Sequence, residues 1–204
     1  MIEKTKRQIL CKILWCSIYV FAPMMIFAQK VPTNGHLEEQ LKPIKENFKR
    51  INSIKNWFLI DEKELWETPL ETLEGGNAKF YYQNGQIEKI VTQQAGETFQ
   101  VIIEYYLLNG QLSFAFKKLY RYNRPFDWDL KKMEEMEEYE DTEAFDFEKS
   151  EIIEDRCYFE NGKLIHHIKS SKGNRSELRG DTDMEGEKTI KEDFEELIKI
   201  AKKE

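Results

Sequence analysis

Residues 181–192 carry the acidic spacing of a calcium-binding loop. Asp181, Asp183 and Glu192 stand at the first, third and twelfth positions. Glu185 takes the fifth position and Gly186 the sixth, where such a loop bends sharply. A hard cation prefers several carboxylate oxygens, so the pattern predicts a weak calcium site and no other cofactor. The alternative is an acidic loop in which Glu192 only favours the N-terminal end of the last helix.

Histidine and cysteine are too scattered for a second metal site or a nucleophilic centre. His166 and His167 are neighbours in a strand-like run, so their side chains point to opposite faces and cannot share one ion. Cys157 lies in an apolar and aromatic run, which favours a buried, inert thiol. The sequence has no nucleophile elbow, zinc-protease helix motif or glycine-rich phosphate loop. We therefore expect a protein that is not an enzyme, although its many carboxylates leave a glycosidase pair open.

Adjacent tyrosines and a nearby basic residue form the candidate ligand-binding set. On a strand, neighbouring side chains point to opposite faces, so each tyrosine pair should expose one ring and bury the other. An exposed ring can contact a sugar or a peptide, while cross-strand packing accounts for the same rings without a ligand. The set is Tyr81, Tyr82, Tyr105, Tyr106, Tyr122 and Arg124.

Most of these residues lie in or beside three copies of one hairpin motif. Each copy begins with tyrosine in an apolar run, continues with Asn-Gly, and ends with Gln or Lys and a branched aliphatic residue. The copies occupy residues 81–87, 106–112 and 158–164. Asn-Gly between two strand-like runs predicts a tight hairpin, because a type I′ turn needs positive φ at both central positions. The wider spacing before the third copy leaves room for an insertion.

The rest of the chain supplies two amphipathic helices and that insertion. Apolar residues recur at helical spacing over 37–54 and 190–201. Pro43 should begin the first helix or kink a longer one. Residues 127–155 hold 14 acidic residues against three lysines, which predicts an exposed, partly helical insertion. Such a segment can simply be solvated, or it can dock a cationic partner.

The predicted order of elements defines the fold class. A helix is followed by five or six strands, the acidic insertion, one more hairpin and a final helix; the run at 57–60 is the first strand candidate. This order is α+β: an antiparallel β-meander of Asn-Gly hairpins with N-terminal and C-terminal amphipathic helices. We expect both helices on one face or at one end of the sheet, and residues 36–204 as a single domain.

The hairpin units are similar to the variant MORN repeats found in many bacterial proteins. The longer stretch over about residues 74–168 resembles uncharacterised exported proteins of Bacteroidota-type bacteria. The resemblance implies an exported compartment and a meander fold, and no settled activity. With three copies and a long break, the chain favours a small closed domain over a repeat solenoid.

The first 28 residues have the pattern of a secretory signal peptide. A basic start precedes an uncharged apolar stretch over 13–28, which is shorter than the roughly 20 residues that cross a bilayer and is interrupted by Pro23. We expect cleavage near Ala28, a tether over 29–35, and a periplasmic or secreted protein without a membrane span after signal removal. An uncleaved anchor is the alternative.

Composition narrows the function classes. The 204 residues are 40% hydrophobic and 34% charged, with a net charge of −7 at pH 7. Such an acidic chain lacks the cationic face that nucleic-acid phosphates require. The leading hypothesis is an exported, non-enzymatic binding or interaction module whose partner is an unknown envelope protein or glycan. The alternatives are an envelope or glycan hydrolase that uses paired carboxylates, and a structural envelope component.

Overall fold

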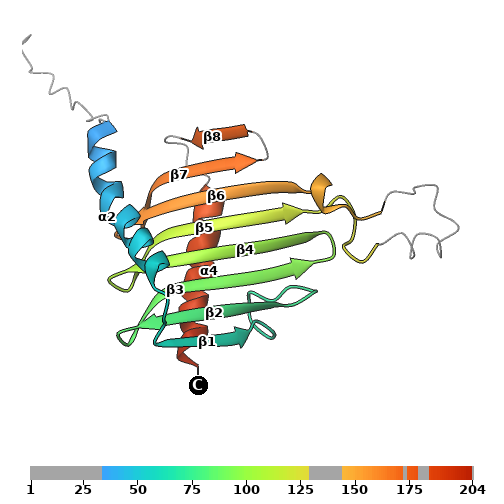
Figure 1. The fold of residues 1–204 in the computed structure, drawn as a ribbon, viewed down its shortest axis with the longest axis horizontal. Helices are drawn as coiled ribbons and strands as arrows, with labels where there is room; N and C mark the ends of the chain where they lie inside the picture. The colour runs from blue at the N-terminus through green and yellow to red at the C-terminus, as the bar shows by residue number, and fades with distance from the viewer. Residues whose placement is uncertain (1–33, 129–143, 172–173, 179–183, 204) are drawn as a thin grey trace, which may run out of the picture. The chain divides into compact units, whose positions relative to one another are not determined.

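The computed structural model describes residues 34–128, 144–171, 174–178 and 184–203. Eight strands form one antiparallel sheet and follow one another across it in chain order. Helix α2 (Asn34–Ser53) precedes the sheet and helix α4 (Met184–Lys202) follows it (Figure 1). The strands are β1 (Leu59–Glu64), β2 (Gly76–Gln83), β3 (Gln86–Gly96), β4 (Phe99–Leu108), β5 (Gln111–Arg121), β6 (Glu151–Glu160), β7 (Lys163–Ser171) and β8 (Asn174–Leu178). The predicted α+β meander with a helix at each end is confirmed.

The two helices cover opposite faces of the sheet, α2 in front and α4 behind in Figure 1. On one face, Ile44 and Ile51 of α2 pack with Tyr106 and Phe114. On the other face, α4 closes a larger core. Its buried members include Ile190, Leu197, Ile200, Phe80, Ile90, Tyr105 and Phe159. The expectation that both helices lie on one face or at one end was wrong, because each face of the sheet has an apolar row that needs its own cover.

The three Asn-Gly hairpins share one turn and one irregularity. The Asn and Gly of every turn have positive φ, as a type I′ turn requires. In each hairpin the pairing then skips one residue of the second strand, at Glu88, Ser113 and Ile165. A bulge of this kind increases the local twist. The hairpins β2–β3, β4–β5 and β6–β7 therefore place three similar, twisted tips at one end of the sheet.

Several element boundaries differ from the sequence expectations. β1 begins at Leu59 and continues to Glu64, beyond the apolar run at 57–60. α2 is a single helix that continues through Pro43, which neither begins nor ends it. After the insertion the sheet has three strands, because β8 adds a short strand to the single hairpin that we expected.

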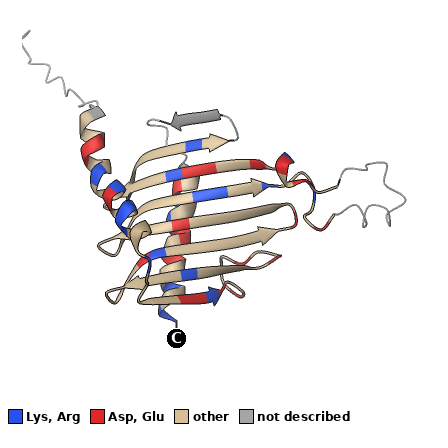
Figure 2. Cartoon of the chain, viewed as in Figure 1, with Lys and Arg blue, Asp and Glu red and all other residues tan. Residues whose placement is uncertain are grey.

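Strand β6 begins inside the predicted acidic insertion. Glu151 lies opposite Arg121 and Glu154 opposite Lys118, and both pairs are ion pairs of 3.3 Å. Figure 2 shows the basic positions of β5 beside the acidic positions of β6. The expectation that the insertion extends to residue 155 was wrong, because cross-strand pairing with opposite charges makes residues 151–155 a strand. The short 3₁₀ helix η1 (Phe147–Lys149) precedes it, and residues 129–143 lie outside the described residues.

Candidate functional site

The structure separates the predicted tyrosine set. Tyr105 and Tyr106 are each only 1% exposed, so the expectation that one ring of this pair faces solvent was wrong. Both are buried because a helix covers each face of the sheet. Tyr81 is half-buried, with its ring 5.2 Å from that of Trp57. Tyr82 packs against the core on the α4 side.

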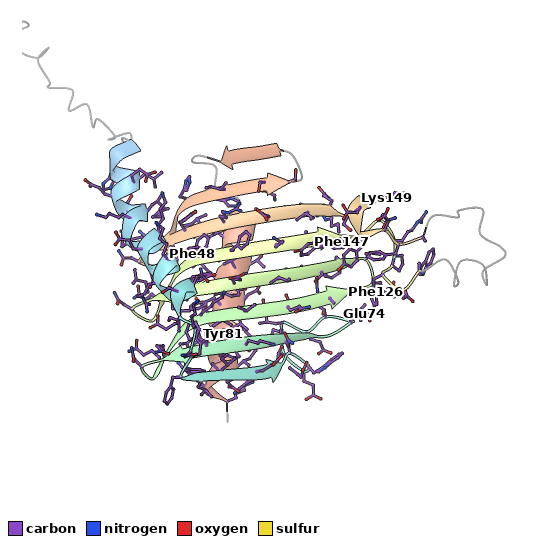
Figure 3. All side chains as sticks on the ribbon, viewed as in Figure 1. Phe48, Glu74, Tyr81, Phe126, Phe147 and Lys149 are labelled. Atoms are coloured by element: carbon purple, nitrogen blue, oxygen red, sulfur yellow. The ribbon has the colours of Figure 1, made fainter. Side chains whose placement is uncertain are left out.

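Tyr122 and Arg124 lie in the segment that follows β5, far from the Asn-Gly turns. The backbone N–H of Tyr122 donates to the carbonyl of Thr98 at 2.8 Å. Figure 3 labels Phe126 at this end of the sheet and Tyr81 at the end that α2 crosses. The six predicted residues therefore do not form one surface.

The calcium pattern falls partly on α4. Asp181 and Asp183 lie outside the described residues. From Met184 onward the chain is helical, so the expectation that Glu185 lies in a loop was wrong. Glu192 lies in the last helix, as both interpretations of the pattern expect. Ion pairs between residues four apart favour the helix. Within the described ranges, no group of three or more His, Cys, Asp or Glu side chains could hold a metal ion.

The histidines lie on opposite sides of β7, as a strand requires. The ring of His166 is 5.5 Å from that of Tyr158 on the α2 side. His167 is buried on the α4 side, and its Nε2 lies 3.2 Å from Oδ1 of Asp155. Cys157 is buried, as the sequence predicted.

Neighbouring hairpins separate at their tips and leave two equivalent gaps. Pairing between β3 and β4 stops at Lys89 and Tyr106, and pairing between β5 and β6 stops at Phe114 and Tyr158. These two pairs occupy the same positions in the repeated motif, just before the bulges spread the strands. We name the space between residues 86–88 and 107–108 gap 1. The space between residues 111–113 and 159–160 is gap 2.

Polar side chains of α2 bridge gap 1. Nδ2 of Asn47 donates a buried hydrogen bond to the carbonyl oxygen of Leu107 at 2.8 Å. Arg50 donates to Oδ1 of Asn47 at 2.8 Å and to Oε2 of Glu88 at 2.5 Å. These bonds tie α2 to both strands that border gap 1.

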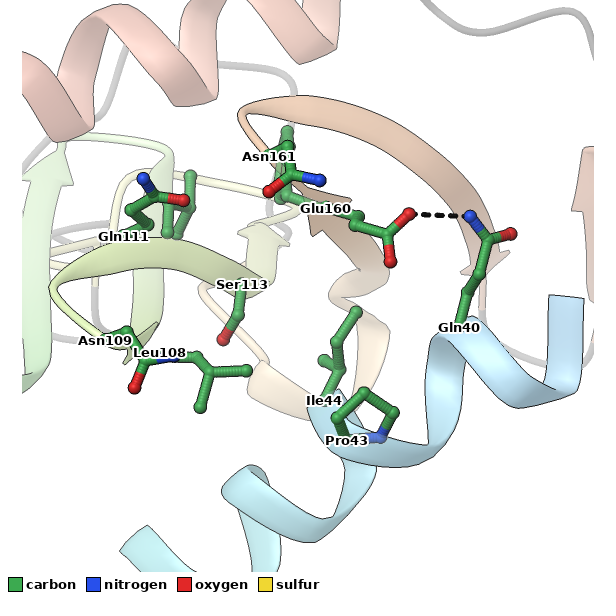
Figure 4. Close-up of a pocket in the computed structure, with 11 residues that line it drawn as sticks. Gln40, Pro43, Ile44, Leu108, Asn109, Gln111, Ser113, Glu160 and Asn161 are labelled. Atoms are coloured by element: carbon green, nitrogen blue, oxygen red, sulfur yellow. Dashed lines mark hydrogen bonds between the residues drawn. The ribbon is translucent and has the colours of Figure 1, made fainter.

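Gap 2 is hollow. At its rim, Nε2 of Gln40 donates to Oε2 of Glu160 at 2.6 Å (Figure 4). The cavity beneath has a volume of about 360 Å³. Its lining residues are Gln40, Pro43, Ile44, Leu108, Asn109, Gln111, Leu112, Ser113, Phe159, Glu160 and Asn161. A second cavity of about 350 Å³, bordered by α4, shares four of these residues: Gln111, Leu112, Phe159 and Asn161.

The spacing along α2 explains why one helix reaches both gaps. Gln40 and Asn47 are seven residues apart, which is about 10.5 Å along a helix axis. Equivalent positions in successive hairpins are two strands apart, which is about 9.6 Å across a sheet. Because the two periods nearly match, the helix presents one polar residue to each gap. Ile44, which lies between Gln40 and Asn47, and Ile51, which follows Asn47, are buried against the sheet and anchor the helix.

The lining of gap 2 combines an apolar floor with an amide rim. Leu112 and Phe159 are buried in the floor. The rim has the amide groups of Asn109, Gln111 and Asn161, which can each donate and accept hydrogen bonds. Among the described residues that line this cavity, Glu160 is the single carboxylate. Such a site suits an uncharged polar ligand.

Sequence reasoning selected none of the residues that line gap 2. The Asn-Gly residues were interpreted only as turn formers, and their position beside a cavity depends on bulges that the sequence pattern does not reveal. One signal was present: Gln40 and Asn47 interrupt the apolar face of the helix at the spacing of the hairpins.

No protein-family model, curated protein or solved structure matches the chain. Of the helices in the described ranges, none combines the length and apolar character that a bilayer crossing requires. A functional proposal therefore rests on the geometry of gap 2.

Proposed function

We propose that the exported chain is a non-enzymatic binding module that holds a small neutral saccharide in gap 2. The proposal rests on the contrast between gap 1 and gap 2, which occupy equivalent positions in the repeated hairpin motif. Asn47 bridges gap 1 through its hydrogen bond to the carbonyl of Leu107, whereas gap 2 has a cavity of about 360 Å³. That volume lies within the range of about 300–1,000 Å³ typical of small-molecule sites.

The chemistry of the lining supports a neutral ligand with hydroxyl groups. Amides match hydroxyls because both can donate and accept. The C–H faces of a sugar suit the apolar lining residues that keep exposed surface, Pro43 and Leu108. Glu160 already accepts a hydrogen bond from Gln40, so its charge is partly satisfied before any ligand arrives.

A bulky substitution at the rim tests this function. We expect calorimetric titration of the chain from Gln29 with glucose, galactose, N-acetylglucosamine and their disaccharides to show binding. Gln111→Trp should weaken that binding by about tenfold or more, because Gln111 lines both cavities. Gln86→Trp is the matched control, since Gln86 follows the Asn-Gly turn of the first hairpin and is also exposed. It should leave the affinity unchanged.

The same samples separate binding from hydrolysis. Absence of binding to every sugar of the panel, or equal affinities of Gln111→Trp and the wild type, would contradict the proposal. If the wild type instead hydrolysed a disaccharide to monosaccharides, and Glu160→Gln did not, the result would support the carboxylate hydrolase.

A further inference from the structure

Strand β1 is an edge of the sheet. It pairs with β2 along Leu59–Glu64, and it is the first strand in the sheet order. In the part of the chain that the structure describes, no strand pairs with its other side. An edge strand presents unpaired backbone N–H and C=O groups to any extended chain that can lie beside it.

The beginning of this edge is unusually apolar for an exposed position. Phe58 is 78% exposed, Leu59 49% and Ile60 50%. Exposed apolar residues that adjoin one another on an edge favour an interaction site over a solvated strand. The neighbouring Trp57 packs against Tyr81 and keeps this region in place.

The charges that follow decide what can pair with the edge. Because strand side chains alternate, Ile60, Glu62 and Glu64 point to one face. All three are exposed, and so is Phe58, which comes directly before the strand. A strand added in antiparallel direction would face them with two basic residues and then two apolar residues, each separated by one position. Opposite charges directly across two strands stabilise the pairing, and like charges destabilise it.

A second copy of this chain does not meet that requirement. Antiparallel pairing about Asp61 places Asp61 opposite its own copy and Ile60 opposite Glu62. Pairing about Ile60 places Phe58 opposite Glu62. Parallel pairing in register places each glutamate beside the same glutamate. These three arrangements set apolar against acidic residues or acid against acid. Antiparallel pairing about Leu59 would match Phe58 with Ile60, but it leaves Glu62 and Glu64 without a basic residue opposite.

We infer that β1 binds an extended segment of a partner protein with the pattern basic-x-basic-x-apolar-x-apolar, added as a ninth, antiparallel strand. The backbone of the partner segment forms hydrogen bonds with the edge of β1. Its alternate side chains pair with the acidic residues and pack against the apolar residues of β1. This surface is separate from gap 2, so the inference does not depend on the saccharide proposal.

The probe is a fluorescent peptide, Lys-Thr-Lys-Thr-Val-Thr-Val-Thr, with a control in which Glu replaces both Lys. Fluorescence anisotropy with the chain from Gln29 should show the lysine peptide binding about tenfold more tightly, as expected for two cross-strand charge pairs. Amide hydrogen exchange at 59–64 should slow when the lysine peptide saturates the protein. The double variant Glu62→Lys and Glu64→Lys should reverse the preference between the peptides. Glu62 also pairs with Lys79 at 3.4 Å and accepts a hydrogen bond from Asn77 at 3.0 Å. Both contacts and both substituted positions are exposed, so the variant should lose little stability and is expected to fold.

Three results would overturn the inference. The first is equal affinity for both peptides, or unchanged exchange at 59–64. The second is a dimer in light scattering that dissociates in the double variant, which would assign the edge to a second copy. The third is a preference for the lysine peptide that the double variant leaves unchanged, which would assign the binding to another acidic part of the surface.

Discussion

Asn47 and Gln40 occupy equivalent positions on α2 but make contacts of different kinds. The amide of Asn47 reaches a buried backbone carbonyl, whereas the amide of Gln40 reaches the half-buried carboxylate of Glu160 at the rim of gap 2. An unpaired buried carbonyl loses its full hydration, and a rim carboxylate can still be hydrated by water. The energetic importance of the two residues should therefore differ.

Asn47→Ala should lower the free energy of unfolding by about 1–3 kcal/mol, because the carbonyl of Leu107 is left without a partner. Gln40→Ala should cost about 1 kcal/mol or less, since the Gln40–Glu160 pair is only partly buried. Urea unfolding of both variants checks the comparison. Equal losses would mean that gap 1 is not held closed by this bond.

At the scale of elements, the charges between β5 and β6 give a pH dependence. Burial alone would raise the pKa of Glu154, but hydrogen bonds from Arg156 and Lys118 outweigh it and lower the pKa below its usual 4.5. A carboxylate whose pKa is lower in the folded state adds stability above the unfolded pKa. That stability is lost as the pH falls through the folded pKa.

Glu154→Gln should therefore be less stable than the wild type at pH 7, by about 1 kcal/mol or less. The two unfolding curves should converge as the pH falls from about 4.5 toward 3. Thermal unfolding between pH 3 and 7 measures this difference. Glu151→Gln is the control, because its pair with Arg121 is largely exposed and should leave the midpoint nearly unchanged. A constant difference between Glu154→Gln and the wild type across the pH range would contradict the assignment.

The hairpins were the most predictable elements. Asn-Gly carries its own conformational requirement, so the turns at 84–85, 109–110 and 161–162 follow from local chemistry. The bulges do not follow from local chemistry, because the position of an extra residue on one strand depends on packing across the sheet. The start of β6 could not be predicted either. A run of carboxylates has the sequence pattern of a solvated loop, and it forms a strand here because the basic residues of β5 lie opposite it.

At the scale of the whole molecule, the unpredicted features arise from long-range contacts. Sequence periodicity showed two apolar helix faces but not that they cover opposite sides of the sheet, and this arrangement buries Tyr105 and Tyr106. The same arrangement lets α2 run across the hairpin tips and meet two gaps that are distant in sequence (Figure 1). The position of the gap 2 site therefore depends on the fold, because the spacing of polar residues along α2 matches the spacing of hairpins across the sheet.

The most direct test of this account is amide chemical-shift mapping of the ¹⁵N-labelled chain from Gln29, titrated with each sugar of the panel. We predict the largest shifts at 109–113, 159–161 and 40–44, where the cavity of gap 2 lies, and little change at the equivalent residues 84–88 of gap 1. The account would be contradicted if no sugar shifted these amides, or if the largest shifts fell on gap 1 or on the far end of the sheet.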